Sequence, residues 1–385
     1  MSTASSPTNA SWKRLLERDS GWRRFLPASI VIIATALAYA ATSRLGFVGD
    51  DLLQIVGNPF ITSWKFLPRY FASHVWSYVY PHLLANYYRP FFLVWLRLNE
   101  GAFGQWAAGC HLTSAALHVI VTYVVYRLLF HFTLEPWAAA AGALLFGLHP
   151  VHVEAVAYVS AAPELLSCLF VLATLLFWLR HAGKGREVSA AGVRKAHGAF
   201  AGTAQSRPER IALCLGVSLL FYLAALFSKE GSLVFPILVG AYALVEYKQV
   251  GTPSKRLRFA LTAIFPFLAV TVAYLPLRIW ALKGFAHIVT PVPLVTEIFT
   301  IPSVLLFYMR LLVWPVGLGC YYDTPFVEGF CVSGCGCPCR VCCSGALVWE
   351  DAKAFTRAGA AFGPGGAVDG LRHRAGPELS PATGR

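Results

Sequence analysis

The chain has 385 residues, of which 57% are hydrophobic and only 13% are charged, and its mean hydropathy is +0.57. Soluble domains carry about 25% charged residues, so this composition excludes a soluble protein and indicates an integral membrane protein. The formal net charge of +13 is attributed to cytoplasmic loops and anionic lipid headgroups. Since no basic stretch is interleaved with aromatic residues, we expect no nucleic-acid partner.

The amino-terminal part predicts one span followed by a long loop. Residues 1–24 are polar and basic, which favours the cytoplasmic side. Residues 25–45 form an apolar run of the length that a bilayer requires, and without a clear cleavage site it is interpreted as a retained anchor. Residues 46–106 then form an aromatic-rich loop on the opposite, outer side. Tyrosine and tryptophan favour the headgroup level, so short interfacial helices are expected there.

The rest of the apolar sequence predicts further membrane spans. The segments are residues 107–129, 137–148 (with a continuation through 151–160 as an alternative), 163–179, 211–227, 232–247, 259–282 and 301–318. The basic loops between them, 180–210 and 248–258, fall on the same side as the amino terminus. The predicted fold class is therefore all-α: a polytopic transmembrane helical bundle of seven to nine spans, with an outer loop between spans 1 and 2.

The carboxy-terminal part has a different character. Residues 331–343 contain six cysteines without zinc-ribbon spacing. Residues 345–385 are rich in Gly, Ala, Arg and Pro and lack an apolar period, which is typical of disorder. Our hypothesis is that the tail, residues 331–385, is disordered and arises from an out-of-frame translation or a truncation, and the coding DNA would decide this. A thiol-rich metal-binding tail is the alternative.

Asp50 and Asp51 directly follow the first apolar run. Ionisable residues beside a membrane span indicate a functional site. The Gly-Asp-Asp sequence is also ordinary turn chemistry. Both interpretations remain open on spacing alone.

Three cations are candidates for binding a phosphate. Arg89 precedes an apolar helix, and arginine forms bidentate bonds to phosphate; the alternative is an interfacial anchor. Lys229 lies beside Glu230, so the two charges either neutralise each other or present the ammonium to an anion. Arg278 lies near the outer end of residues 259–282, with snorkelling to the interface as its alternative.

His149, His152 and Glu154 are candidates for lining the same outer site. Histidine and carboxylate side chains ligate divalent ions, but three such residues without a defined geometry are weak support for a metal. The alternative is a helix end whose polar groups are satisfied. We therefore expect no cofactor and no metal, with a divalent ion as the alternative.

Several separated segments together resemble one family. They are Phe47-Val48-Gly49-Asp50-Asp51, Gln54-Ile55, Asn58-Pro59, Tyr88-Arg89-Pro90, His111-Leu112, Leu117-His118, the run from His149 to Ala157, and Ser228-Lys229-Glu230. In this order they resemble the membrane region of the transmembrane and tetratricopeptide-repeat proteins, a branch of the GT-C glycosyltransferases. The resemblance covers about residues 25–325, which we expect to form a GT-C-like transmembrane domain.

The resemblance implies a function. Members of this family transfer mannose or a similar sugar from a polyprenyl-phosphate carrier to Ser or Thr hydroxyls of proteins. The implied partners are a polyprenyl-phosphate-linked sugar, a protein acceptor and the bilayer. The implied location is a bacterial plasma membrane with the active site on its outer face. The implied roles are catalysis by Asp50 and Asp51, phosphate binding by Arg89, Lys229 and Arg278, and lining of the site by His149, His152, Glu154 and Glu230.

The sequence departs from the family pattern in two places. Where the family often has Gly-Arg-x-Asp, this chain has residues 160–164, Ser-Ala-Ala-Pro-Glu, which removes one basic contact. Residues 331–385 contain no 34-residue helical period, so an inactive remnant of a glycosyltransferase is one alternative. A transporter or permease is another, although transporters usually place their polar residues near the midplane on broken helices.

Overall fold

The computed structural model describes residues 25–81, 85–182, 208–246, 252–284 and 292–319, together with Tyr322, Phe326 and Val327. The chain divides into two units, Met1–Val289 and Thr290–Arg385. Throughout the described ranges every regular element is a helix, which confirms the predicted all-α class. The predictions for residues 1–24 and for the tail lie outside the described residues.

Most helices of the first unit coincide with predicted spans. They are α3 (Leu26–Tyr39) with the 3-10 turn η1 (Ala40–Arg44), α6 (Ala107–Thr133), α7 (Pro136–Gly147), α9 (Ala162–Ala182), α10 (Pro208–Ser228), α11 (Phe235–Glu246) and α12 (Pro253–Leu282). Local sequence explains several of the ends. α7 starts with proline in its first turn, and Glu135 caps the amide of Ala138. α6 stops at Leu134, which adopts a left-handed conformation.

The number of predicted spans is not confirmed. Within the described residues, five helices are long and apolar enough to cross a bilayer, and a sixth crossing results if Pro136–Gly147 and Pro150–Ala157, bent by 49°, form one broken span. The predicted fifth and sixth spans correspond to shorter apolar helices, Ala212–Ser228 and Glu230–Val245. In the second unit, α13 (Leu294–Val313) begins earlier than the predicted segment 301–318.

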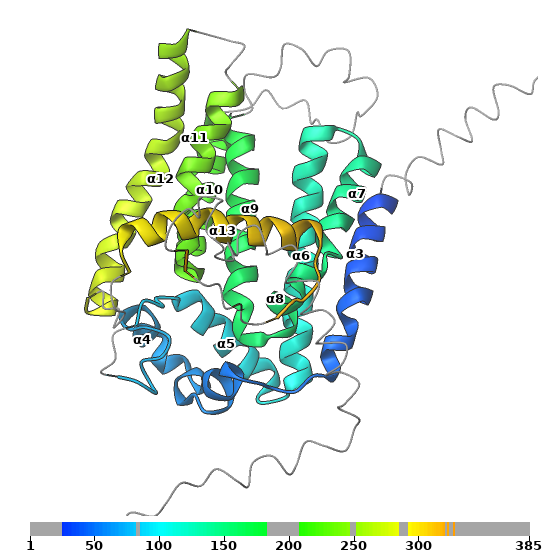
Figure 1. Cartoon of the computed structure of the whole chain (residues 1–385), viewed down its shortest axis with the longest axis vertical. Coiled ribbons are helices and arrows are strands. Elements are labelled where there is room, and N and C mark those ends of the chain that lie inside the picture. The colour runs from blue at the N-terminus through cyan, green and yellow to red at the C-terminus, as the bar shows by residue number, and fades with distance from the viewer. Residues whose placement is uncertain are drawn as a thin grey trace, which may run out of the picture. The chain divides into compact units, whose positions relative to one another are not determined.

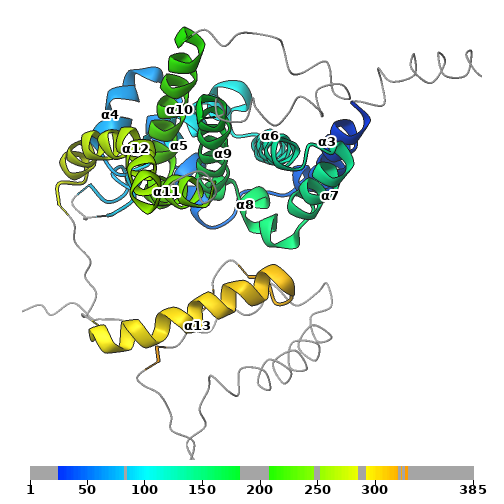
Figure 2. The same ribbon diagram turned by 90° about the horizontal axis from the view of Figure 1, so that it is seen from above.

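The helices of the first unit pack in two neighbouring groups. α3, α6 and α7 contact one another. In the second group α9 packs on α10, α10 on α12 and α12 on α11, and α6 joins the groups by packing on α9 (Figures 1 and 2). The approach within the first group is close at Gly147. A Cβ there would lie 2.5 Å from Thr122 Cγ2 and 2.8 Å from Thr35 Oγ1. Only glycine therefore fits this position without a shift of its neighbours.

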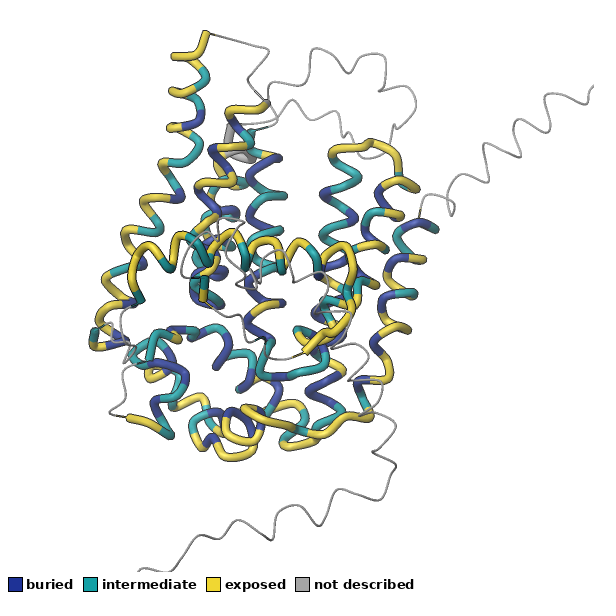
Figure 3. Tube along the Cα trace, viewed as in Figure 1, coloured by how far each residue is buried: buried dark blue, intermediate teal, exposed yellow. Residues whose placement is uncertain are grey.

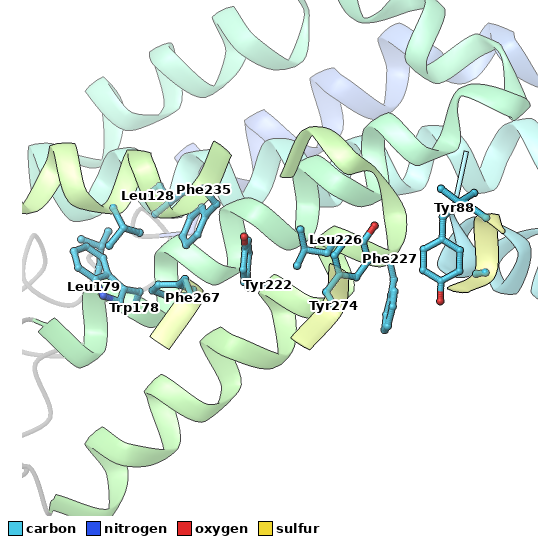
Figure 4. Packing of buried hydrophobic residues seen from close by; sticks show 13 residues of the cluster. Tyr88, Leu128, Trp178, Leu179, Tyr222, Leu226, Phe227, Phe235, Phe267 and Tyr274 are labelled. Carbon is cyan, nitrogen blue, oxygen red and sulfur yellow. The ribbon is translucent and has the colours of Figure 1, made fainter. Parts of the chain in front are cut away.

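Aromatic side chains fill the core of the second group (Figure 4). The ring of Phe267 lies edge-on to Tyr222 and Phe235, with centroids 5.5 and 5.1 Å apart. Each such pair contributes about 0.5–1.5 kcal/mol beyond the area it buries. Large apolar residues such as Leu220 and Phe265 are exposed, and exposed positions recur along the helices (Figure 3). Lipid tails cover such surfaces in a bilayer, which agrees with an integral membrane protein.

The loop between the first two long helices is structured, as predicted. It contains a π-helical turn η2 (Leu52–Val56), two 3-10 turns, the short helix α4 (Leu67–Ala72) and the helix α5 (Pro90–Phe103). Ile61 and Tyr70 are buried in a core that the loop shares with Cys110 of α6 and with Val159 and Ala162 at the start of α9. α5 packs on α9 and α10, and α4 packs on α12. The loop thus covers one end of the helices (Figure 1), called here the loop end of the bundle.

Candidate active site

Asp51 is fully buried at the loop end, and its carboxylate is occupied by hydrogen bonds. Ser160 donates to Oδ1 from its amide (2.8 Å) and from its hydroxyl (2.6 Å). The amide of Val48 donates to Oδ2 at 3.4 Å. Ser160 lies between α8 (Val153–Ala157) and α9, so Asp51 fastens the loop to a segment 109 residues away. This environment suits a structural carboxylate.

Asp50, by contrast, is exposed. Its amide donates to the hydroxyl of Tyr158 at 2.8 Å, and that hydroxyl is also within hydrogen-bonding reach of the Asp50 carboxylate. Burial raises the pKa of Tyr158 to about 12. The hydrogen bond from the Asp50 amide lowers this pKa, while the negative charges of Asp50 and Asp51 raise it. Tyr158 therefore stays protonated at neutral pH and can donate to the carboxylate that it holds.

Gly49 allows this arrangement. Its φ is +53°, a left-handed conformation that disfavours a side chain. A Cβ at this position would lie 3.2 Å from the Tyr158 hydroxyl. Glycine is therefore required here both for the turn and for the approach of the tyrosine. The turn directs Asp51 inward and leaves Asp50 at the surface.

Arg89 forms a bidentate ion pair with Glu230 at the same end of the bundle. Arg89 Nη2 lies 2.9 Å from Oε1 and Nε lies 3.3 Å from Oε2, and the guanidinium stacks on the ring of Tyr87 at 4.9 Å. Burial raises the pKa of Glu230, but the hydrogen bond from Arg89 and the charges of Arg89 and Arg278 outweigh it, so the pKa lies below its ordinary value. Glu230 is thus a carboxylate at neutral pH.

Arg278 is only 7% exposed. Its Nη1 donates to the hydroxyl of Tyr274 at 3.1 Å, and its Nη2 donates to the carbonyl of Asn86 at 2.8 Å. Within the described ranges no carboxylate forms an ion pair with it, although its charge acts on Glu230. Arg89 and Arg278 together therefore carry one positive charge more than Glu230 neutralises. A phosphate is a fitting ligand for such a pair.

Lys229 is paired with Glu164. Their side chains are 30% and 45% exposed, so the pair contributes little to stability. Glu154 is exposed and within electrostatic range of both. One interpretation of the sequence was that Lys229 and its neighbour Glu230 neutralise each other, and this is wrong. Glu230 pairs with Arg89 and Lys229 pairs with Glu164.

The two predicted site histidines serve local structure. His149 Nδ1 accepts a hydrogen bond from the Val151 amide at 3.2 Å and caps the turn after α7. The ring of His152 packs on Phe146 and His118, with centroids 4.5 and 5.2 Å away. Among the residues that the structure describes, no three His, Cys, Asp or Glu side chains are placed to hold a metal ion. The expectation that no cofactor is needed remains a prediction.

Several of these groups are close to one another in sequence and lie at the loop end, and together they are called here the band. Tyr158, Ser160 and Glu164 lie within seven residues around the start of α9, and Lys229 and Glu230 are adjacent between α10 and α11. No hydrogen bond or ion pair within the described residues joins Asp50 to either arginine. The band thus offers an exposed carboxylate at one part and a cationic pair at another. Sequence reasoning did not single out Tyr158, Ser160, Glu164, Tyr274 or Asn86 for these roles.

Comparison with known proteins gives relatives of one type. A part of the chain is 33% identical over 147 residues to protein O-mannosyl-transferase Tmtc2 of Drosophila melanogaster, covering 37% of this chain and 16% of that protein. The protein O-mannosyl-transferase F38B6.6 of Caenorhabditis elegans is 31% identical over 183 residues, covering 45% of this chain and 24% of the relative. The mouse protein O-mannosyl-transferase TMTC3 is 27% identical over 175 residues, 45% of this chain and 19% of the relative.

The matched region therefore spans less than a quarter of the length of each of these relatives. No family model matches the chain, and no solved structure matches it. The relatives nevertheless confirm the resemblance predicted from the motifs, since all three carry the same description. The chain is thus similar, over 37–45% of its length, to proteins described as protein O-mannosyl-transferases.

Proposed function

We propose that this chain contains the sugar-transfer site of a protein O-mannosyltransferase. The site takes mannose, or a similar sugar, from a polyprenyl-phosphate donor and attaches it to a Ser or Thr hydroxyl of a protein. The observation that supports this best is the division of the Asp-Asp pair into one buried carboxylate that accepts three hydrogen bonds and one exposed carboxylate, at the end of the bundle that also carries the two arginines.

Asp50 is the proposed general base. The acceptor hydroxyl oxygen forms a bond to C1 of the sugar as the bond from C1 to the phosphate oxygen breaks, and the hydroxyl proton passes to the Asp50 carboxylate. A positioned base typically contributes 10²–10⁴-fold to such a step. Tyr158 orients this carboxylate through its hydroxyl. Asp51 is proposed as a positioning residue, because its oxygens are already occupied.

Arg89 and Arg278 are proposed to bind the donor phosphate. The donor is a phosphodiester with one negative charge, and the departing polyprenyl phosphate gains a second. Fixed cations stabilise charge that develops in the transition state. Arg278 supplies a guanidinium without an ion-pair partner among the described residues. Lys229 is proposed as an outer contact, since it must first leave Glu164.

His149, His152, Glu154 and Glu230 were predicted to line the site. We retain Glu230, which orients Arg89, and Glu154, which is exposed beside Lys229. The proposed location of the site is the non-cytoplasmic face of the membrane. The relatives named above come from a fly, a nematode and a mouse, so a bacterial plasma membrane remains a prediction from the motifs alone.

The proposal is tested by measuring transfer of radiolabelled mannose from polyprenyl-phosphate mannose to a Ser/Thr-rich acceptor protein, with the purified full chain in lipid nanodiscs. Asp50→Asn should lower the transfer rate at least a hundredfold. Glu297→Gln, which changes an exposed carboxylate on α13, is the matched control and should transfer normally. Equal rates for both variants would refute the role of Asp50. Absence of transfer by the unmodified chain would favour the inactive-remnant alternative.

One observation favours a transporter as a second candidate. α7 and Pro150–Ala157 form a bent pair, and broken helices line the substrate sites of many transporters. Most of the carboxylates and cations, however, lie away from this break: Asp50, Asp51 and Arg89 belong to the loop before α6, and Glu164 and Arg278 lie near the ends of α9 and α12. Only Glu154 belongs to the bent pair. Uptake of the polyprenyl-phosphate sugar into vesicles without transfer to acceptor would decide for the transporter.

A further inference from the structure

A second cationic feature lies at the loop end, separate from Arg89 and Arg278. It is a hollow of about 570 Å³ between α4 and the end of α12. One wall is formed by residues 68–81, including Arg69, Ser73 and His74, and the other by Ala281, Leu282 and Lys283. α4 and α12 pack on each other, so both walls belong to one rigid arrangement.

The two cations of this hollow are exposed, and neither has an ion-pair partner among the described residues. The Arg69 guanidinium lies over the ring of Phe60, 3.9 Å from its centroid. Lys283 follows α12 in a left-handed conformation, with φ of 57°, which ends the helix and directs the chain away. Neither forms an ion pair with a carboxylate in the part of the chain that the structure describes. In this they differ from Arg89 and Lys229, which are both paired.

The rest of the lining combines apolar and hydroxyl groups. Pro68, Ala72 and Leu282 provide apolar contacts, while Ser73 and Ser77 provide hydroxyls. The Ser73 hydroxyl donates to the carbonyl of Arg69 at 2.9 Å, and the Ser77 hydroxyl donates to that of Ser73 at 3.0 Å. α12 is one of the helices long enough to span a bilayer, and Lys283 is the residue directly after it. The hollow therefore lies where a spanning helix ends, which is the depth of the lipid headgroups.

We propose that this hollow binds the phosphate of a glycerophospholipid, with Arg69 and Lys283 on the phosphate oxygens and the glycerol against the apolar wall. A lipid phosphate fits better than a free phosphate because the lining beside the cations is apolar and lies at the membrane interface. The site is distinct from the donor-phosphate site, and the proposal does not depend on sugar transfer. Bound there, a lipid joins α4 to α12.

The test uses native mass spectrometry of the purified full chain in detergent, titrated with phosphatidylglycerol, with uncharged diacylglycerol of the same acyl chains, and with inorganic phosphate. The variants are Lys283→Gln and Arg69→Gln/Lys283→Gln. The matched control is Arg44→Gln/Lys65→Gln, which removes two exposed cations of the same amino-terminal region outside the hollow. Because Lys283 is exposed, its single variant leaves the packing unchanged.

We expect phosphatidylglycerol to be retained and diacylglycerol not. The apparent Kd should rise about fivefold for the single variant and about 25-fold for the double variant, since each cation near a lipid surface contributes ~1 kcal/mol. The control should bind as the unmodified chain does. Equal weakening in the control would overturn the site. Inorganic phosphate binding as tightly as phosphatidylglycerol would overturn the lipid assignment in favour of a free anion.

Discussion

Replacing Asp51 tests whether its carboxylate has a structural or a catalytic role. In Asp51→Ala the amide and the hydroxyl of Ser160, which is half-buried, both lose their acceptor. Hydrogen bonds to a charged group contribute about 1.5–3 kcal/mol each, and unsatisfied buried donors cost a similar amount. Because the hydroxyl can turn to another acceptor but the amide cannot, we expect a loss of about 3 kcal/mol.

Asp51→Asn provides an intermediate case. The asparagine oxygen can still accept from Ser160, but the negative charge is lost. Its NH₂ group also faces the amide of Val48, which in the unmodified chain donates to Asp51 Oδ2. The expected cost is about 1–2 kcal/mol, the difference between charged and neutral hydrogen bonds plus one opposed donor. The graded pair of variants thus measures how much of the anchoring depends on charge.

The assay is thermal unfolding of the purified full chain followed by tryptophan fluorescence. A loss of 3 kcal/mol corresponds to a fall in Tm of roughly 6–12 °C at the 2–4 °C per kcal/mol of domains of 150–250 residues, and Asp51→Asn should fall about half as far. Asp50→Asn, at an exposed position, should unfold at the temperature of the unmodified chain. An unchanged Tm for Asp51→Ala would refute the anchoring role. Loss of transfer in Asp51→Asn with an unchanged Tm would make Asp51 the base.

Three further predictions concern glycine positions and one arginine. Gly49→Ala should destabilise the chain by about 1–2 kcal/mol and reduce transfer, since its φ is +53°; Gly46→Ala, whose Cβ would meet nothing within 4 Å, should change neither Tm nor rate. Gly147→Ala should lower Tm through overpacking of about 1–3 kcal/mol, whereas Gly216→Ala, with open space around it, should not. Arg278→Lys should raise the donor KM and lower kcat, with a fall of about tenfold in kcat/KM, because an ammonium cannot keep the forked contacts of the guanidinium; a normal kcat/KM would contradict phosphate binding there.

Apolar length predicted the long helices well. The predicted segments 107–129 and 163–179 lie within α6 and α9, because a continuous apolar run of this length has few other stable conformations in a membrane protein. The starts of α12 and α13 were missed. α12 begins at Pro253 with proline in its first turn and a basic stretch that hydropathy excludes, and α13 includes Glu297 before its strongly apolar part.

The site was predicted only in part. The motifs indicated Asp50, Asp51 and Arg89, and the structure places all three at one end of the bundle. They did not indicate which aspartate is buried, because that depends on Ser160, 109 residues away. No spacing rule reveals such a pairing in a single sequence. The partner of Lys229 was missed for the same reason, since Glu164 lies on another helix.

The central claim, that Asp50 acts on the acceptor while the arginines hold the donor, is tested most directly by separating donor binding from transfer in Asp50→Asn. Binding of polyprenyl-phosphate mannose is measured at equilibrium without acceptor, and transfer is then followed in a single turnover after the acceptor is added. The account predicts an unchanged donor Kd and a transfer rate at least a hundredfold lower. Transfer at the normal rate, or loss of donor binding in this variant, would contradict it.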